Sequence, residues 1–208
     1  KTAWIGGGSL LGELDHEAMS HGLVTTAGTV SHTGVGGLTL GGGFGRLARR
    51  YGLALDNVKA MDVVTADGQL RRASPTENPD LFWGLRGGGG NFGVVTNFEF
   101  GLHEMQREVI GGDIIFPLAQ LRNLLSMYAD YAHTAPDDLY LDVGLISEPG
   151  STDGICLAHA CYSGPAGDAQ RVLAPIYQVG TPLKDGIKAI DYVAIQRSQD
   201  RTDPRNSG

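Results

Sequence analysis

The chain has 208 residues, and 32 of them are glycine, about twice the usual share of roughly 7%. The glycines do not recur every third residue, which excludes a collagen-like chain, and a 41% share of hydrophobic residues excludes a disordered linker. A net charge of −7 argues against a nucleic-acid surface, and no apolar run approaches the roughly 18 residues of a membrane span. We therefore expect a soluble protein, whose compartment stays open because the chain shows no signal peptide and does not begin with Met.

The first half predicts short elements separated by glycine-rich loops. We expect a strand end at residues 2–5, a helix at 10–20 capped by Ser9 and closed by Gly22, a short helix at 46–51, strands at 58–65 and 69–73 around an Asp67-Gly68 hairpin turn, a helix from Pro79 capped by Asn78 and closed by Gly87, and a strand at 94–102. The loops at 27–45 and 87–93 lie between these elements.

The second half has a different pattern, which places a domain boundary near residue 105. We expect a strand at 108–116 interrupted by two glycines, a helix from Pro117, strands at 139–147 and 154–162 that pair antiparallel, a helix at 166–178, and a polar tail at 200–208. The order predicts helices on one face of an antiparallel sheet, an α+β fold. The domains are then residues 1–105 and 106–208, the second of them incomplete.

Neither the cysteines nor the histidines predict a metal site or a disulfide. Cys156 and Cys161 are five apart in an expected strand and point to opposite faces, which favours small core residues. His16 and His21 are poorly spaced for a metal, and the remaining histidines are isolated. Tyr192 and Gln196 are four apart on an expected helix, where packing against the core is the favoured role.

The most informative stretch is Gly34–Gly45. It fails as a dinucleotide fingerprint, because the third required glycine is Thr39 or Arg46, and it fails as a P-loop, because no Lys follows Gly42. Two interpretations stay open. The bare backbone either approaches a flat ring or an anion through its amides, or makes tight bends between packed strands.

Several motifs in order carry a family resemblance. They are the segment from Thr26 to Gly45, Arg49–Val58, Val63–Gly68, and the run from Asn78 to Thr96 with its Asn-Pro-Asp-Leu-Phe-Trp start. Together they resemble FAD-linked oxidases with the FAD-binding fold of p-cresol methylhydroxylase and vanillyl-alcohol oxidase, in the berberine-bridge-enzyme-like group that includes 6-hydroxy-D-nicotine oxidase and oligosaccharide oxidases. The resemblance covers essentially the whole chain.

The resemblance implies a partial FAD-binding domain followed by the start of an antiparallel-sheet substrate domain. The loop 27–37 would line the flavin ring and its ribityl-phosphate end, 41–43 would support that loop, and 91–95 would lie near the adenine side. The implied cofactor-binding residues are Ala27, Gly28, Thr29, Val30, Ser31, His32, Thr33, Gly34, Gly36, Gly37, Thr39, Gly41, Gly42, Gly43, Asn91, Gly93, Val94 and Val95. His32 either contacts the cofactor or relays a proton, or it faces solvent from the loop.

The departures from the family pattern concern the tether and the catalytic residues. Val30 stands where doubly tethered relatives carry a Cys, and a histidyl tether would lie upstream of Lys1. The family's catalytic base and its return segment would follow the end of the chain. The catalytic residues are therefore unassigned, and we expect a fragment that by itself does not hold FAD tightly.

The implied function is an oxidase that transfers a hydride from an alcohol, sugar or amine carbon to FAD, with O2 as the second substrate. The alternative is a non-catalytic or partner-binding fragment, or a pseudoenzyme, of the same fold. A nucleotide-sugar reductase of this fold is a further alternative, against which the Asn78–Trp83 segment argues. A hydrolase is rejected, because the adjacent Ser31 and His32 form no triad unaided.

Overall fold

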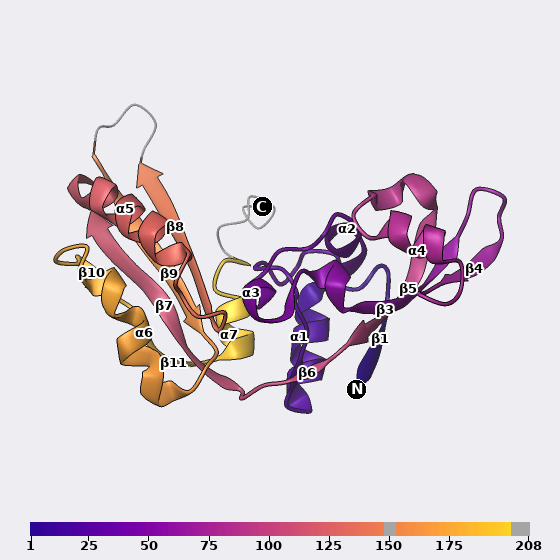
Figure 1. Ribbon diagram of the computed structural model, residues 1–208, viewed down its shortest axis with the longest axis horizontal. Coiled ribbons are helices and arrows are strands. Elements are labelled where there is room, and N and C mark those ends of the chain that lie inside the picture. Colours follow the sequence, from indigo (N-terminus) through magenta and orange to yellow (C-terminus); the bar gives the residue numbers. More distant parts are fainter. Residues whose placement is uncertain (148–152, 201–208) are drawn as a thin grey trace. The chain divides into compact units, whose positions relative to one another are not determined.

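The computed structural model describes residues 1–147 and 153–200. The chain divides into two units, each with its own sheet and core (Figure 1). The first unit is Lys1–Arg107 together with the described residues from Gln196 to Asp200, and the second unit is Glu108–Ile195. The chain thus passes out of the first unit after Arg107 and re-enters it at Gln196.

The first unit is built on a four-stranded antiparallel sheet in the order β1-β5-β3-β4. Its strands are β1 (Thr2–Gly6), β5 (Val94–Gly101), β3 (Val58–Val64) and β4 (Leu70–Ala73), and a separate pair is formed by β2 (Leu23–Val24) and β6 (His103–Glu104). The hairpin between β3 and β4 is confirmed, with Gly68 at φ +76° in the turn. Phe98, Met61 and Val63 are fully buried in the core of this unit.

Four short helices surround that sheet. They are α1 (Leu11–Ser20), α2 (Val35–Leu40), α3 (Ala48–Tyr51) and α4 (Pro79–Leu85), with 3-10 turns at Ala54–Asn57 and Gly89–Phe92. The helix stop at Gly22 is confirmed, and α3 likewise ends before Gly52, because both glycines have positive φ angles, +68° and +79°.

Helix α2 corrects the prediction of an irregular loop over residues 27–45. It forms because Val35, Gly36 and Thr39 share a buried face, although its two glycines lower its intrinsic helix propensity. The burial of one face therefore outweighs propensity in this segment.

Of the two predicted helix N-caps, Ser9 is wrong, whereas Asn78 is confirmed as the N-cap residue of α4 although its side chain does not cap the helix. At α1 the N-cap residue is Leu10 rather than Ser9, and the carboxylate of Glu13 accepts the Leu10 amide at 2.9 Å. At α4, Asn78 is left-handed (φ +48°) and its side-chain amide donates to the Arg72 carbonyl at 2.7 Å instead of capping the helix. The competing local hydrogen bonds explain both differences.

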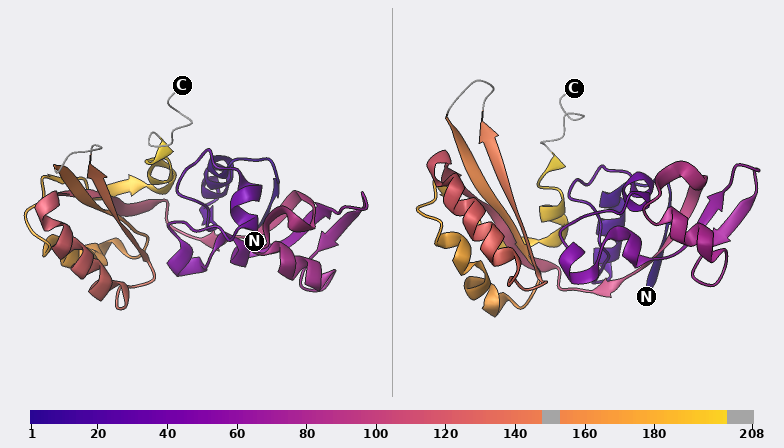
Figure 2. Two further views of the ribbon diagram at one scale, coloured as in Figure 1. Left: turned by 90° about the horizontal axis from the view of Figure 1, so that it is seen from above. Right: turned by 45° about the horizontal axis from the view of Figure 1, so that its top comes forward.

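The second unit confirms the predicted α+β layer. Its sheet has the order β10-β7-β9-β8, with β11 also paired to β7, and every pairing is antiparallel. The strands are β7 (Glu108–Pro117), β8 (Leu139–Ser147), β9 (Gly154–Tyr162), β10 (Lys184–Asp185) and β11 (Lys188–Asp191), and the helices are α5 (Leu121–Ala132), α6 (Ala169–Tyr177) and α7 (Tyr192–Gln196). Helices α5 and α6 cover one face of the sheet in all three views (Figures 1 and 2).

Strand β7 and the starts of helices α5 and α6 differ from the prediction. Strand β7 runs through its two glycines without interruption, because Gly112 keeps its pairing with Ala160 at φ +142°. Helices α5 and α6 are each preceded by a 3-10 turn, at Leu118–Gln120 and Ala166–Asp168, where continuous helices were expected. The predicted tail falls mainly on residues 201–208, which lie outside the described residues.

The two cysteines of the chain are both buried in the second unit. Cys156 lies in the core between the sheet and its helices, and Cys161 is also buried, five residues further along β9. Across residues 1–147 and 153–200, none of the helices has the length and apolarity needed to cross a membrane.

Candidate functional site

The loop between β2 and α2 is fixed by backbone hydrogen bonds to the start of α1. The Leu11 amide donates to the Thr33 carbonyl at 2.9 Å, and the Gly12 amide donates to the Ser31 carbonyl at 2.8 Å. The Val35 amide donates to the Ser9 carbonyl at 2.9 Å. The loop is therefore an ordered part of the first unit.

Three glycine-containing segments meet backbone to backbone beside this loop. A Cβ on Gly36 would lie 2.7 Å from the Gly7 carbonyl oxygen, and a Cβ on Gly7 would lie 2.1 Å from the Val95 carbonyl oxygen. The Gly7 amide donates to Thr96 at 2.8 Å. The structure thus brings the predicted residues Gly36 and Val95 together through the Gly6–Gly8 turn, which the sequence-based list omitted.

Gly34 and Gly37 differ from these packed glycines. A Cβ at either position would meet no atom within 4 Å, and neither residue has a positive φ. Gly34 has φ −71°, which any residue adopts, and Gly37 lies within α2. Nothing in the described chain therefore requires these two residues to be glycine.

Other predicted residues of the loop face inward. Ala27 and Gly28 are buried, and a Cβ on Gly45 would lie 1.6 Å from the Ala27 carbonyl oxygen. The Thr39 hydroxyl is also buried and has no hydrogen-bond partner within the described part of the chain. Thr39 therefore points into the unit, and of the predicted hydroxyls only those of Thr29, Ser31 and Thr33 lie in partly exposed residues.

Short contacts also place the supporting glycines and the second loop. A Cβ on Gly43 would lie 2.4 Å from the Ala54 Cβ, so Gly43 packs against the first 3-10 turn. The Gly87 amide donates to the Leu40 carbonyl at 3.0 Å, which ties the second loop to the end of α2. In that loop Asn91 is exposed and its amide donates to Gly88 at 2.7 Å.

A buried polar network lies under the loop. The Gln196 amide nitrogen donates to Asp15 Oδ2 at 3.1 Å and to the Gly28 carbonyl at 3.0 Å. Gln196 Oε1 accepts from Arg46 Nη1 at 3.0 Å, and Arg46 Nη1 also approaches the Thr29 carbonyl at 3.3 Å. Asp15, Arg46 and Gln196 are all less than 5% exposed.

Burial raises the pKa of Asp15 to about 7, against the opposing effects of the Gln196 hydrogen bond and the Arg46 charge. A perturbed carboxyl of this kind is common at functional sites, although structural networks produce it too. Here the hydrogen bonds run to the loop backbone, which links the network to the candidate site.

Asp200 holds the next part of the loop. Its carboxylate accepts the Ser31 amide at 2.8 Å and the Ser31 hydroxyl at 2.7 Å. His32 Nδ1 lies 3.8 Å from the same carboxylate. His32 is therefore beside an acidic group and partly exposed, with a quarter of its side chain accessible.

Sequence reasoning missed this polar layer. Gln196 was expected to pack against the core, and it is buried, but its contacts are hydrogen bonds rather than apolar packing. The signals were an Asp on the apolar face of α1 and an Arg directly after Gly45, both at positions where a lone charge is costly. Their partner was not identifiable, because it lies some 150 residues further along the chain.

The second unit carries a polar group of its own. His159 on β9 and Asp113 on β7 are cross-strand neighbours whose side chains meet at 2.6 Å. Tyr140 donates a short hydrogen bond to Asp142 on β8, and the Tyr140 ring stands edge-on to His159. Within the described residues, no three His, Cys, Asp or Glu side chains are arranged to hold a metal.

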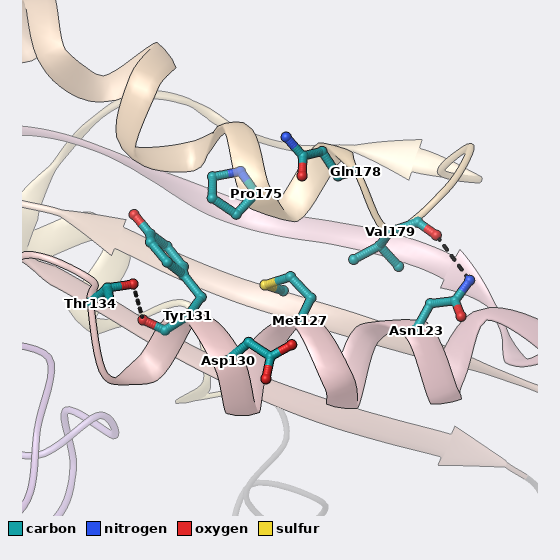
Figure 3. Close-up of a pocket in the computed structure, with 8 residues that line it drawn as sticks. All are labelled: Asn123, Met127, Asp130, Tyr131, Thr134, Pro175, Gln178 and Val179. Atoms are coloured by element: carbon teal, nitrogen blue, oxygen red, sulfur yellow. Dashed lines mark hydrogen bonds between the residues drawn. The ribbon is translucent and has the colours of Figure 1, made fainter.

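A groove of about 420 Å³ in the second unit runs between α5 and α6 (Figure 3). Met127, Pro175 and Val179 supply its apolar walls, and Asn123 donates to the Val179 carbonyl at 3.4 Å across it. The Tyr131 hydroxyl donates to the Val172 carbonyl at 2.7 Å. The Tyr131 bond joins α5 to α6 and the Asn123 bond joins α5 to the residues just after α6, so the groove is the seam between these segments.

Comparison with known proteins bears on the first unit most directly. A family model described as an FAD binding domain matches residues 1–74. An FAD-linked oxidoreductase of Dictyostelium discoideum is 35% identical over 198 residues, which are 94% of this chain and 42% of that protein.

Two solved structures share the fold. The crystal structure of 6-hydroxy-D-nicotine oxidase from Arthrobacter nicotinovorans matches with a TM-score of 0.88 and 33% identity, over 97% of this chain and 45% of that one. A chitooligosaccharide oxidase matches with a TM-score of 0.82 and 28% identity, over 96% and 42%. The chain spans less than half the length of these proteins. The chain is therefore similar to FAD-linked oxidoreductases along most of its length, and its residues 1–74 match an FAD binding domain.

Proposed function

We propose that the protein is an FAD-dependent oxidase that removes a hydride from an alcohol, sugar or amine carbon. In this proposal residues 1–105, joined by the returning segment from Gln196, contribute part of the FAD-binding domain. Residues 106–195 begin the substrate domain. The proposal is supported by the homology to FAD-linked oxidoreductases and by the backbone of the loop 27–37.

The observation that carries the proposal is that Gly34 and Gly37 lack side chains although neither packing nor backbone conformation requires it. Close packing explains Gly7, Gly36 and Gly45, each of which has no room for a Cβ. Gly34 and Gly37 have room for one and no conformational need to lack it. A cofactor lying against this backbone supplies the missing reason, because a flat ring or a phosphate approaches bare backbone closely.

The chain's own residues fit such a group in chemical type. The partly exposed residues Thr29–Thr33 offer the hydroxyls of Thr29 and Thr33 and the amides of Thr29 and Val30, and Gly34–Gly37 offer backbone only. We assign Gly41–Gly43 to the support of this loop, and Asn91 and Gly93–Val95 to the far side of the cofactor. Val30 carries no nucleophile, so no cysteinyl bond forms at that position.

When bound, FAD supplies the hydride acceptor, which O2 reoxidises with release of hydrogen peroxide. The loop's part is to bind and orient through its amides and hydroxyls, and its one titratable side chain, His32, lies 3.8 Å from the Asp200 carboxylate. The names of the homologous oxidases favour a small organic substrate with an oxidisable C–N or C–O bond. We assign no catalytic base.

Substitution at Gly37 tests the cofactor position in the intact protein that carries this chain. Gly37→Ala adds a methyl group in open space on a helix, so the FAD-free protein should gain up to about 1 kcal/mol of stability. FAD titration should nevertheless show a Kd raised about tenfold, and Gly37→Leu should bind still more weakly. Gly167→Ala is the matched control, since its Cβ also meets nothing within 4 Å. An unchanged Kd for both Gly37 variants would contradict the assignment.

A peroxide assay separates the oxidase from a non-catalytic homologue. The FAD-loaded intact protein is incubated with alcohols, sugars and cyclic amines, and flavin bleaching without oxygen is followed alongside peroxide release in air. Bleaching and peroxide with one substrate class support the oxidase. Tight FAD binding with no bleaching across the panel supports the non-catalytic alternative.

A further inference from the structure

The residues that re-enter the first unit contact one short stretch of the candidate flavin loop. Gln196 binds the Gly28 carbonyl, and Asp200 binds the amide and hydroxyl of Ser31. Ser198 accepts from Arg46 Nη2 at 3.3 Å, and the same guanidinium approaches the Thr29 carbonyl. Thus two side chains within five residues, about 170 positions further along the chain, bind residues 28–31 directly, and Ser198 between them is linked to Thr29 through Arg46.

Two successive carbonyls of the loop point toward the buried network. The Gly28 carbonyl accepts from Gln196, and the Thr29 carbonyl accepts from Arg46. Both donors are 3% exposed or less, so these bonds are shielded from competing water. These two hydrogen bonds therefore fix the orientations of the peptide groups that join Gly28 to Thr29 and Thr29 to Val30.

The direction of the carbonyls fixes the direction of the next two amides. In a trans peptide the N–H of one residue points opposite to the C=O of the residue before it, and the described chain has no cis peptide. The Thr29 and Val30 amides therefore point away from the network, and neither finds an acceptor among residues 1–147 and 153–200. Both residues are partly exposed.

We infer that Gln196 and Asp200, with Arg46, form a clamp that presents the Thr29 and Val30 amides as a pair of donors to FAD. The inference rests on the proposed function, which supplies the acceptor atoms. Gln196 and Asp200 are positioning residues, since they act through the loop backbone. The clamp also explains why a glutamine stands at position 196, because its side-chain amide donates two hydrogen bonds and accepts one within the clamp.

The test substitutes Asp200 in the intact protein, because a fifth of its side chain is exposed and its loss leaves no deeply buried charge. Asp200→Ala should raise the Kd for FAD about tenfold and speed amide exchange at residues 28–32 in the FAD-free protein. Asp200→Asn keeps one acceptor and should recover part of both effects. Gln196→Met, which keeps the volume and loses the donors, should weaken FAD at least as much.

Asp185→Ala is the matched control. Asp185 likewise accepts one backbone amide, from Ile187 at 2.9 Å, and one hydroxyl, from Tyr177 at 2.9 Å. It should lower stability comparably and leave the FAD Kd and the exchange at 28–32 unchanged. Equal effects of Asp200→Ala and Asp185→Ala on both readouts would overturn the clamp. If the unaltered protein binds no FAD, the proposed function itself fails.

Discussion

The two glycine loops of the first unit have similar compositions and different reasons for their glycines. In the loop 87–93, Gly87, Gly89 and Gly93 have positive φ angles, so the backbone conformation itself favours glycine. In the segment 34–37, no glycine has a positive φ, and two have open space around them. Composition alone therefore does not identify a binding loop. A glycine without a conformational or steric cause, such as Gly34, Gly37 or Gly90, is only a candidate contact, which FAD titration of its variant tests.

The largest expected effect comes from Gly93. A Cβ there would lie 2.3 Å from the Val64 carbonyl oxygen on a backbone at φ +142°, so strain and overpacking add. Gly93→Ala should lower the free energy of unfolding by about 4 kcal/mol, measured by urea denaturation of the FAD-free protein. A loss below about 1 kcal/mol would mean that the backbone around Val64 shifts to accommodate the added methyl group, contrary to the steric explanation of this glycine.

The network under the first loop should make the stability of the unit depend on pH. The folded pKa of Asp15 is about 7, above its ordinary value of 3.8, so the folded state binds the proton more tightly than the unfolded state. Stability is then highest below about pH 4 for this group and falls as pH rises through 7. Between about pH 5 and pH 7 the loss should be about 2 kcal/mol.

Asp15→Asn isolates that contribution. The Asn oxygen still accepts the Gln196 amide, and the residue has no charge to bury. Chemical denaturation from about pH 5 to pH 8 should therefore show a shallower decline for the variant than for the unaltered protein. Parallel curves would mean that Asp15 is already ionised in the folded state across this range.

Most of the fold was predictable from sequence because its signals are local. The pair β8 and β9, the hairpin at Gly68 and the helix stop at Gly22 follow from alternation and turn chemistry within a few residues. Helix α2 was missed because its stability comes from tertiary burial of Val35 and not from propensity. A short-range signal does not reveal such burial.

The candidate site was predictable only in part. The motifs between Thr26 and Thr96 predicted a flavin loop through the family resemblance, and the family match and homology support FAD as its cofactor. The buried layer of Asp15, Arg46 and Gln196 was not predictable, because its members are brought together by the return of the chain into the first unit. Pairing at that separation leaves no pattern in a single sequence.

A moderate effect is expected at Gly89, which has φ +65° and open space around a Cβ. Only the backbone conformation opposes a side chain there, so Gly89→Ala should cost about 1 kcal/mol of stability. Gly89→Asn should recover part of that loss, because Asn tolerates the left-handed region. Thermal unfolding of the two variants decides this, and equal losses would mean that a steric contact, not φ, is the cause.

The variants Gly34→Ala and Gly90→Ala should change stability least. They also compare the two loops most directly. Both glycines have open space around a Cβ and neither has a positive φ, so each variant should stay within about 0.5 kcal/mol of the unaltered protein without FAD. They should separate when FAD is titrated, with the Kd raised about tenfold for Gly34→Ala and less than about twofold for Gly90→Ala. Because the local backbone is permissive at both positions, a difference in Kd reports the cofactor alone. Equal Kd values would place the two loops in the same relation to FAD and remove the distinction drawn between them.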